Sequence, residues 1–217
     1  MPSPRIVRET KRAIEEREPP DPGLLRPHEW LSEESLSCFG SAIKSGEPFR
    51  LYLSEKAEQK IRLQAVREAP GRLEVMGFLL GEVNSWQGVT YAKVKDVGTT
   101  GLMSSSSKVR FDPEQLPKLF LELDDSGFDY ILVGWYHSHP GHTCFLSKTD
   151  LETQRTMFDQ PYHAALVIDP VNHDIRTFRL AGDGYEEIPF AIYGQEAAGS
   201  GKKARRRRLK AAPATCK

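Results

Sequence analysis

Residues 130–150 read YILVGWYHSHPGHTCFLSKTD, and this stretch decides the fold. It opens with an apolar run that continues into YHSH, which predicts a strand. The Pro-Gly pair that follows favours a turn, and Ser147 followed by KTD has the pattern of a helix N-cap. The stretch therefore predicts strand, turn and helix, with several polar side chains gathered where the strand ends.

Similar patterns flank this stretch on both sides. The run LEVMGFLLGEV is apolar on both faces and is expected at the centre of a sheet. The segment 98–108 (GTTGLMSSSSK) predicts a loop, because it is rich in glycine and serine. Strands are predicted at 49–53, 73–83, 89–98, 164–170, 174–180 and 185–193, and helices at 54–69, 116–127 and 148–160. The order predicts a mixed α/β domain, a β-sheet flanked by helices.

Composition divides the chain into three parts. Residues 1–47 are polar and punctuated by proline, and we expect an N-terminal extension that is partly helical or disordered, with Ser32 as the cap of its one helical patch. Residues 48–193 hold the predicted domain. Residues 194–217 form a basic tail, expected to be disordered, in which seven of the nine residues 202–210 are Lys or Arg.

Charge and cysteine content narrow the class of protein. Lys plus Arg and Asp plus Glu number 30 each, so no overall field favours nucleic acid, and such a partner is not expected. The three cysteines are far apart and form no CxxC pair, which argues against a disulfide framework or a thiolate zinc site. No apolar run reaches the ~20 residues of a membrane span. We expect a soluble, cytoplasmic protein.

A metal site is the leading interpretation of the polar stretch. His137 and His139 lie two apart on a strand, so both imidazoles leave the same face, and Asp150 follows eleven residues after His139. Two imidazoles and one carboxylate, with a fourth position for water, form the ligand set of a catalytic zinc. Helix capping is the alternative for Ser147 and Asp150, but it does not account for the two histidines.

Hydrolysis at such a site needs a base, and Glu74 is the best candidate. It opens a predicted strand and shares its face with apolar residues, so partial burial would raise its pKa. The alternative is a strand-end carboxylate that faces water beside Arg72. A nucleophile made of Cys144 and His142 is weaker, because no third group that would orient it can be identified. The sequence contains no HExxH, P-loop or GxGxxG motif.

These residues resemble those of the JAMM (MPN+) metalloproteases, the family of deubiquitinating isopeptidases that includes the catalytic subunit of the proteasome lid. The family pattern is a glutamate on an early strand, then His-x-His-Pro, then Ser-x-x-Asp. This chain matches it at Glu74, His137, His139, Pro140, Ser147 and Asp150. The resemblance covers about residues 49–193 and implies the cytidine-deaminase-like MPN fold. The short C-terminal segment favours a compact member of archaeal type.

The resemblance also implies roles. His137, His139 and Asp150 would bind Zn²⁺, Glu74 would act as the base, and Ser147 would stabilise the oxyanion. The substrate would be the bond between the C-terminal glycine of a ubiquitin-like modifier and a lysine, or a modifier precursor. Expected partners are ubiquitin or a ubiquitin-like modifier with its conjugates, and proteasome-related machinery. The alternatives are a JAMM hydrolase that acts on a sulfur-carrier protein and a non-catalytic MPN scaffold.

Overall fold

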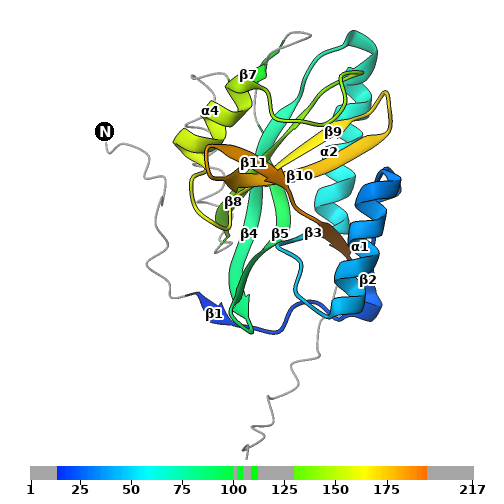
Figure 1. Cartoon of the computed structure of the whole chain (residues 1–217). Coiled ribbons are helices and arrows are strands. Elements are labelled where there is room, and N and C mark those ends of the chain that lie inside the picture. The colour runs from blue at the N-terminus through cyan, green and yellow to red at the C-terminus, as the bar shows by residue number, and fades with distance from the viewer. Residues whose placement is uncertain (1–13, 100–101, 105–108, 112–129, 195–217) are drawn as a thin grey trace, which may run out of the picture.

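The computed structural model describes residues 14–99, 102–104, 109–111 and 130–194 (Figure 1). One ten-stranded sheet runs through this part of the chain. Its long central strand β4 (Met76–Trp86) pairs with β5 (Val89–Gly98) on one side and with β8 (Ile131–Ser138) on the other. The predicted mixed α/β fold, a sheet flanked by helices, is confirmed, and so is the central place of LEVMGFLLGEV.

The sheet extends outward from β4 in both directions. Beyond β8 lie β9 (Ala164–Asp169), which is parallel to β8, and then β10 (Asp174–Ala181) and β11 (Gly184–Glu187). Beyond β5 lie β3 (Leu51–Ser54), β12 (Phe190–Tyr193) and β2 (Leu25–Arg26), while β1 (Glu15–Glu16) pairs with the far end of β4.

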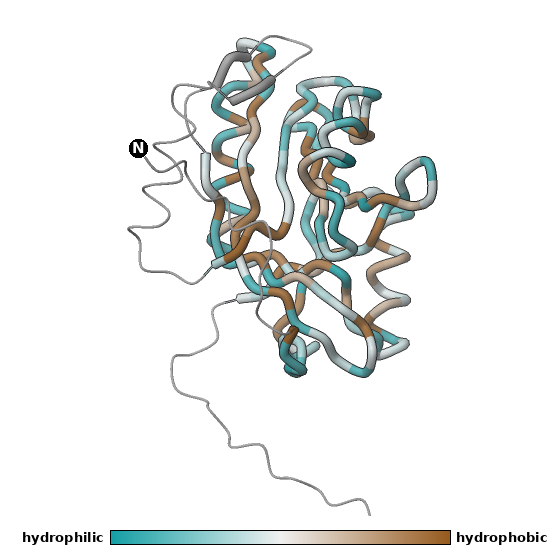
Figure 2. Tube along the Cα trace, turned by 90° about the vertical axis from the view of Figure 1, so that its left-hand side faces the viewer, coloured by the Kyte–Doolittle hydropathy of each residue, from teal (hydrophilic) through white to brown (hydrophobic). Residues whose placement is uncertain are grey.

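Helices cover both faces of this sheet. α2 (Glu55–Glu68) begins at the predicted cap Ser54 and buries Ala57, Ile61 and Ala65 against one face. α1 (Glu33–Ser45) begins at the predicted cap Ser32 and buries Phe39 against the opposite face, which α4 (Lys148–Met157) also covers. Short 3-10 helices lie at Pro22–Leu24 and Ala69–Gly71. Hydrophobic residues, brown in Figure 2, occur along both strands and helices, and the buried ones form clusters on the two faces of the sheet.

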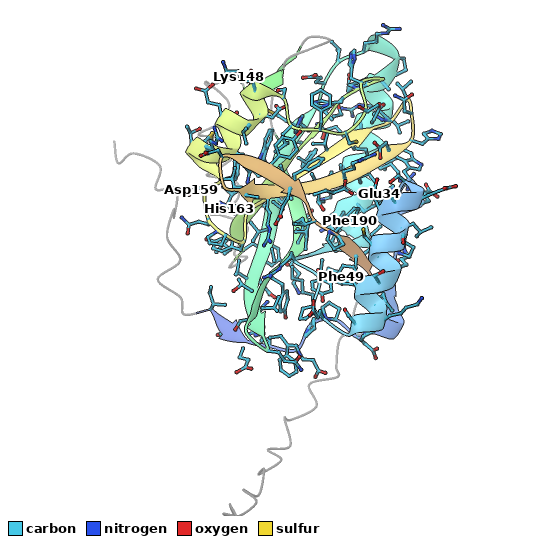
Figure 3. All side chains as sticks on the ribbon, in the orientation of Figure 1. Glu34, Phe49, Lys148, Asp159, His163 and Phe190 are labelled. Atoms are coloured by element: carbon cyan, nitrogen blue, oxygen red, sulfur yellow. The ribbon has the colours of Figure 1, made fainter. Side chains whose placement is uncertain are left out.

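The N-terminal extension packs onto the sheet. Phe39 of α1 contacts Phe49, which Figure 3 labels, with ring centroids 5.2 Å apart. The buried His28 lies 3.1 Å from the carboxylate of Glu58 on α2, so this segment is also tied to the helix on the other face. Described residues from 14 to 47 therefore add two strands and a helix to the same body.

Three sequence predictions differ from the structure. The predicted loop 98–108 contains β6 (Leu102–Ser104), which forms a hairpin with β7 (Val109–Phe111). The predicted strand 185–193 is two strands, because Pro189 has no N–H for a ladder and the chain leaves β10 there for β3. Strand β4 begins at Met76, so Glu74 lies just before it. The predicted helix at 116–127 and nearly all of the predicted tail lie outside the described residues.

Candidate metal centre

Strand β8 carries His137 to the face that α4 covers, and His139 follows directly after the end of the strand. The Nε2 atoms of His137 and His139 lie 3.0 Å apart, and the two side chains are almost fully buried. Ser138 between them points to the opposite face and is 0 % exposed. The same-face arrangement that the spacing predicts is present in the structure.

Asp150 reaches the histidines from the first turn of α4. Its Oδ2 lies 3.5 Å from Nε2 of His137 and 3.7 Å from Nε2 of His139. Ligands ~2.0–2.1 Å from a tetrahedral zinc ion are ~3.3 Å apart, so these three atoms fit one face of its coordination tetrahedron. No other group of three or more His, Cys, Asp or Glu side chains in the described part of the chain converges in this way.

The tautomer of His139 follows from a backbone contact. Its Nδ1 lies 3.1 Å from the carbonyl oxygen of Thr143, and a carbonyl can only accept a hydrogen bond. Nδ1 therefore carries the proton, and in the neutral ring Nε2 presents its lone pair toward Asp150 and His137. The distance of 3.0 Å between the two Nε2 atoms places both nitrogens where a single cation would contact them.

Ionisation in this cluster also suits a cation. Burial lowers the pKa of His137, so this ring is neutral at pH 7. Burial opposes the charge on Asp150 as well, but the neighbouring His137 and His139 and the contact with Ser147 hold the pKa of its carboxyl far below the usual range. The cluster thus offers an anionic oxygen and neutral imidazole nitrogen.

Ser147 combines the two roles that the sequence left open. It is the N-cap of α4, with the amide of Asp150 donating to its Oγ at 3.2 Å, and Asp150 Oδ2 accepts from the amide of Ser147 at 2.8 Å. This capping box fixes the carboxylate beside the histidines. The hydroxyl accepts in the cap, so its proton remains available to a further acceptor.

Glu74 enters the same place from the segment before β4. It is 7 % exposed and lines a cleft of about 360 Å³ together with Trp135, His139, Phe145, Ser147 and Asp150. Burial raises the pKa of Glu74 to about 7; His139 opposes this rise, and the charge of Asp150 adds to it. A carboxyl group with this pKa exchanges protons readily near neutral pH. The predicted desolvated position is present, and the alternative of a solvated strand-end carboxylate is not.

Comparison with known proteins identifies the family. The family model described as "JAB1/Mov34/MPN/PAD-1 ubiquitin protease" matches residues 50–160. The chain belongs to this family. The matched range of the JAB/MPN domain runs from β3 to the end of α4 and contains every residue of the proposed metal centre.

Curated relatives of this JAB/MPN chain are subunits of large assemblies. It is 35% identical over 122 residues to the 26S proteasome non-ATPase regulatory subunit 14 of Dictyostelium discoideum, covering 56% of this chain and 39% of that protein. It is 32% identical over 148 residues to the COP9 signalosome complex subunit 5 of Debaryomyces hansenii, covering 63% and 30%. The Saccharomyces cerevisiae protein named "Ubiquitin carboxyl-terminal hydrolase RPN11" is 37% identical over 118 residues, covering 52% and 38%.

The chain thus spans about a third of the length of the curated relatives that it matches. Among solved structures, the solution structure of a Desulfitobacterium hafniense protein matches with a TM-score of 0.50 at 18% identity, covering 67% of this chain and 94% of that one. This likeness concerns the fold alone.

Two further residues of the JAB/MPN site were missed in the sequence. Trp135 stacks on His137 with ring centroids 4.5 Å apart and an angle of 10° between the rings, and its Nε1 donates to Oε1 of Gln154 at 2.6 Å. Gln154 is fully buried and lies four residues after Asp150, so both side chains project from the same face of α4. The four-residue spacing was the signal in the sequence that could have identified Gln154. The hydrogen bond between Gln154 and Trp135 holds α4 against strand β8.

The cysteine alternative loses its chemical basis in the structure. Cys144 is 7 % exposed, and burial raises the pKa of its thiol far above the usual range. Its Sγ lies 3.3 Å from the carbonyl oxygen of Val167, in the core beneath the site. A thiol in such surroundings stays protonated and unreactive. His142 lines the outer part of the cleft and is not one of the three converging ligands.

Proposed function

We propose that this protein is a zinc-dependent isopeptidase. Its substrate would be the amide bond between the C-terminal glycine of a ubiquitin-like modifier and a lysine, and the peptide bond of a modifier precursor offers the same carbonyl. The observation that carries the proposal is the convergence of two imidazole nitrogens and one carboxylate oxygen, within 3.7 Å of one another, beside a glutamate with a pKa of about 7.

His137, His139 and Asp150 would hold the ion, and the three-ligand set leaves a coordination position open, as catalytic rather than structural zinc sites do. A zinc ion bound here would act as a Lewis acid that acidifies water and polarises the scissile carbonyl. The charges also fit, because the single carboxylate offsets part of the charge of a divalent cation in this buried place.

Glu74 and Ser147 would carry the proton transfer and the stabilisation of charge. The Glu74 carboxylate accepts the proton of the attacking water and later delivers it to the departing lysine nitrogen. Its raised pKa places both transfers near neutral pH. The Ser147 hydroxyl donates to the carbonyl oxygen as negative charge develops there, a contribution of ~3 kcal/mol in comparable oxyanion holes.

The substrate class rests on the family and on the shape of the site. One relative is named a ubiquitin carboxyl-terminal hydrolase, and others are subunits of the 26S proteasome and the COP9 signalosome. An extended C-terminal tail can bind by adding a strand to an exposed edge. Strands β6 and β7 pair with each other, and β7 contacts β4, the strand that follows Glu74, so we propose this hairpin as the place where the tail would add. A proteasome-related setting is proposed on the same relatives.

The cellular setting is a proposal of the same kind. The cysteines that the structure describes, Cys38 and Cys144, are unpaired, which suits the reducing cytoplasm.

The test incubates the purified full chain with ubiquitin-like conjugates and precursors from its own organism. We expect cleavage that is lost in Glu74→Gln and after treatment with a zinc chelator, and restored by adding zinc. Cys144→Ser serves as the matched control, because its hydroxyl can keep the contact with Val167, and it should cleave at the wild-type rate. Cleavage that survives both treatments but fails in Cys144→Ser would refute the zinc mechanism, and zinc binding without cleavage of any conjugate would favour the scaffold or another substrate.

A further inference from the structure

Asp169 is a buried carboxylate outside the ligand set whose hydrogen bonds converge on the loop that follows His139. It ends strand β9 and is 0 % exposed. Its Oδ1 accepts the amides of Gly141 (2.8 Å), Val171 (2.9 Å) and Asn172 (3.1 Å). Its Oδ2 accepts the amide of Thr143 (2.8 Å) and the side-chain amide of Asn172 (2.7 Å).

The loop that these bonds hold has an unusual backbone. Gly141 has φ of 83° in a turn that is closed by the amide of His142 donating to the carbonyl of His139 at 3.1 Å. Thr143 has φ of 63°, a left-handed conformation that a residue with a branched side chain rarely adopts. Such a conformation persists only where its surroundings impose it. The bond from the Thr143 amide to Oδ2 of Asp169 is one contact that imposes it.

The other side of the Thr143 backbone faces the metal centre. Its carbonyl oxygen is the partner of His139 Nδ1 at 3.1 Å. The amide held by Asp169 and this carbonyl both belong to Thr143, so a shift of the loop would turn the carbonyl away from the ring. His139 would then lose the contact that keeps its proton on Nδ1 and its lone pair on Nε2.

We propose that Asp169 is the positioning residue of the metal centre, which fixes the tautomer and orientation of His139 through the backbone of Thr143. The zinc part of this inference rests on the proposed function; the tautomer part does not. Asp169 touches neither substrate nor ligand, and it acts through a single residue.

The negative charge of Asp169 is needed for it to hold the loop. Burial alone would raise its pKa, but the amides of Gly141, Asn172 and Thr143 outweigh burial and lower the pKa below the usual range. Each of its oxygens accepts two or three hydrogen bonds, which only an ionised carboxylate can do on both sides. Asn has the same shape but places an NH₂ group on one side, where it would face other donors.

The experiment compares Asp169→Asn with Asp174→Asn in the full chain. Asp174 lies on the same β9–β10 hairpin, and its carboxylate pairs with Arg176 and interacts with the side chain of Cys144. This control therefore makes the same chemical change beside the loop, but it leaves the bonds from the amides of Gly141 and Thr143 to Asp169 in place. The first readout is the tautomer of His139 in metal-free protein, from ¹H–¹⁵N correlation spectra of the imidazole. The second is zinc affinity, from competition with a chelator. Unfolding by urea monitors stability.

We expect His139 to be protonated on Nδ1 in the wild type and in Asp174→Asn, and to become a mixture of tautomers in Asp169→Asn. Zinc affinity should fall ~10–100-fold in Asp169→Asn, as is typical when the partner that orients a metal ligand is lost. An unchanged tautomer and an unchanged zinc affinity in folded Asp169→Asn would overturn the inference.

A second measurement covers the case in which Asp169→Asn fails to fold. Hydrogen exchange on the wild type should show the Thr143 amide protected as strongly as the sheet, and fast exchange there would overturn the inference. Failure of this inference can be told apart from failure of the proposed function. Wild-type protein that binds no zinc overturns the zinc part of both proposals. Protein that binds zinc but cleaves no conjugate overturns only the proposed function.

Discussion

We predict that Ser138, between the two histidines, holds the segment of Glu74, the proposed base, beside the metal centre. Its Oγ accepts the amide of Val75 at 2.9 Å, and its own amide donates to the carbonyl of Val75 at 2.9 Å. Val75 adjoins Glu74, and Ser138 is 0 % exposed. Replacing Ser138 with Ala leaves the Val75 amide buried without its side-chain acceptor.

The cost of that change follows from the burial of the amide. A buried donor left unpaired costs ~1–3 kcal/mol, because it regains neither water nor another acceptor. At ~2–4 °C per kcal/mol for a chain of this size, Tm should fall by ~2–12 °C. Turnover should fall as well, by up to ~100-fold, because a base displaced by about 1 Å transfers its proton poorly.

Thr177→Val provides the matched control for stability. Thr177 is also 0 % exposed, and its Oγ1 donates to the carbonyl of Ile188 at 2.6 Å, on strand β10 away from the cleft. Both variants should lower the free energy of unfolding measured in urea, but only Ser138→Ala should lower kcat at fixed zinc content. If Ser138→Ala keeps the wild-type kcat, or if Thr177→Val lowers kcat by as much, Ser138 does not position Glu74.

Three further changes test other parts of the structure. Ser147→Ala should lower kcat by ~10²–10³ through the lost oxyanion donor and stability by ~1 kcal/mol through the lost cap; an unchanged kcat would leave Ser147 with the cap alone. Gly134→Ala places a Cβ 2.0 Å from the backbone oxygen of Ala164, where φ is 153°, so urea unfolding should show a loss above ~3 kcal/mol, and near wild-type stability would contradict this packing. Burial opposes ionisation of Glu58, but the hydrogen bond from His28 and a neighbouring arginine lower its pKa. Its stabilisation is therefore complete above pH 4.5 and is lost as pH falls through the folded-state pKa, and urea midpoints against pH should fall less steeply in Glu58→Gln.

The site was more predictable than the edges of the sheet, for a physical reason. His137 lies on β8, His139 follows directly after it, and Asp150 lies in the first turn of α4. The period of the strand and the length of the turn therefore place all three with little help from the rest of the chain. Glu74 comes from further away, but the family pattern pointed to it. Its position before β4 depends on the bonds between Val75 and Ser138, which no local pattern encodes.

The tertiary hydrogen bonds of Asp169 and Gln154 could not be predicted from the sequence. An aspartate before a proline at a strand end is expected to form a turn, and its bonds to Val171 and Asn172 do this. Its bonds to Gly141 and Thr143 depend on the parallel pairing of β9 beside β8, a tertiary fact. The spacing places Gln154 on the same helix face as Asp150, but its bond to Trp135 depends on how α4 packs against β8, which the sequence does not encode locally.

The capping alternative and the metal alternative turn out to require one geometry. A capping box needs the Asp150 carboxylate to turn back toward the amide of the N-cap residue Ser147, and that same turn presents Oδ2 to both histidines. The helix N-terminus also favours the anionic form of Asp150 by its dipole, so the ligand is charged before any cation arrives. A strand, a Pro-Gly turn and a capped helix thus form the metal centre from ordinary local rules. In the proposed function, the placement of Glu74 would turn this centre into a hydrolytic site, and we predict that this placement depends on Ser138.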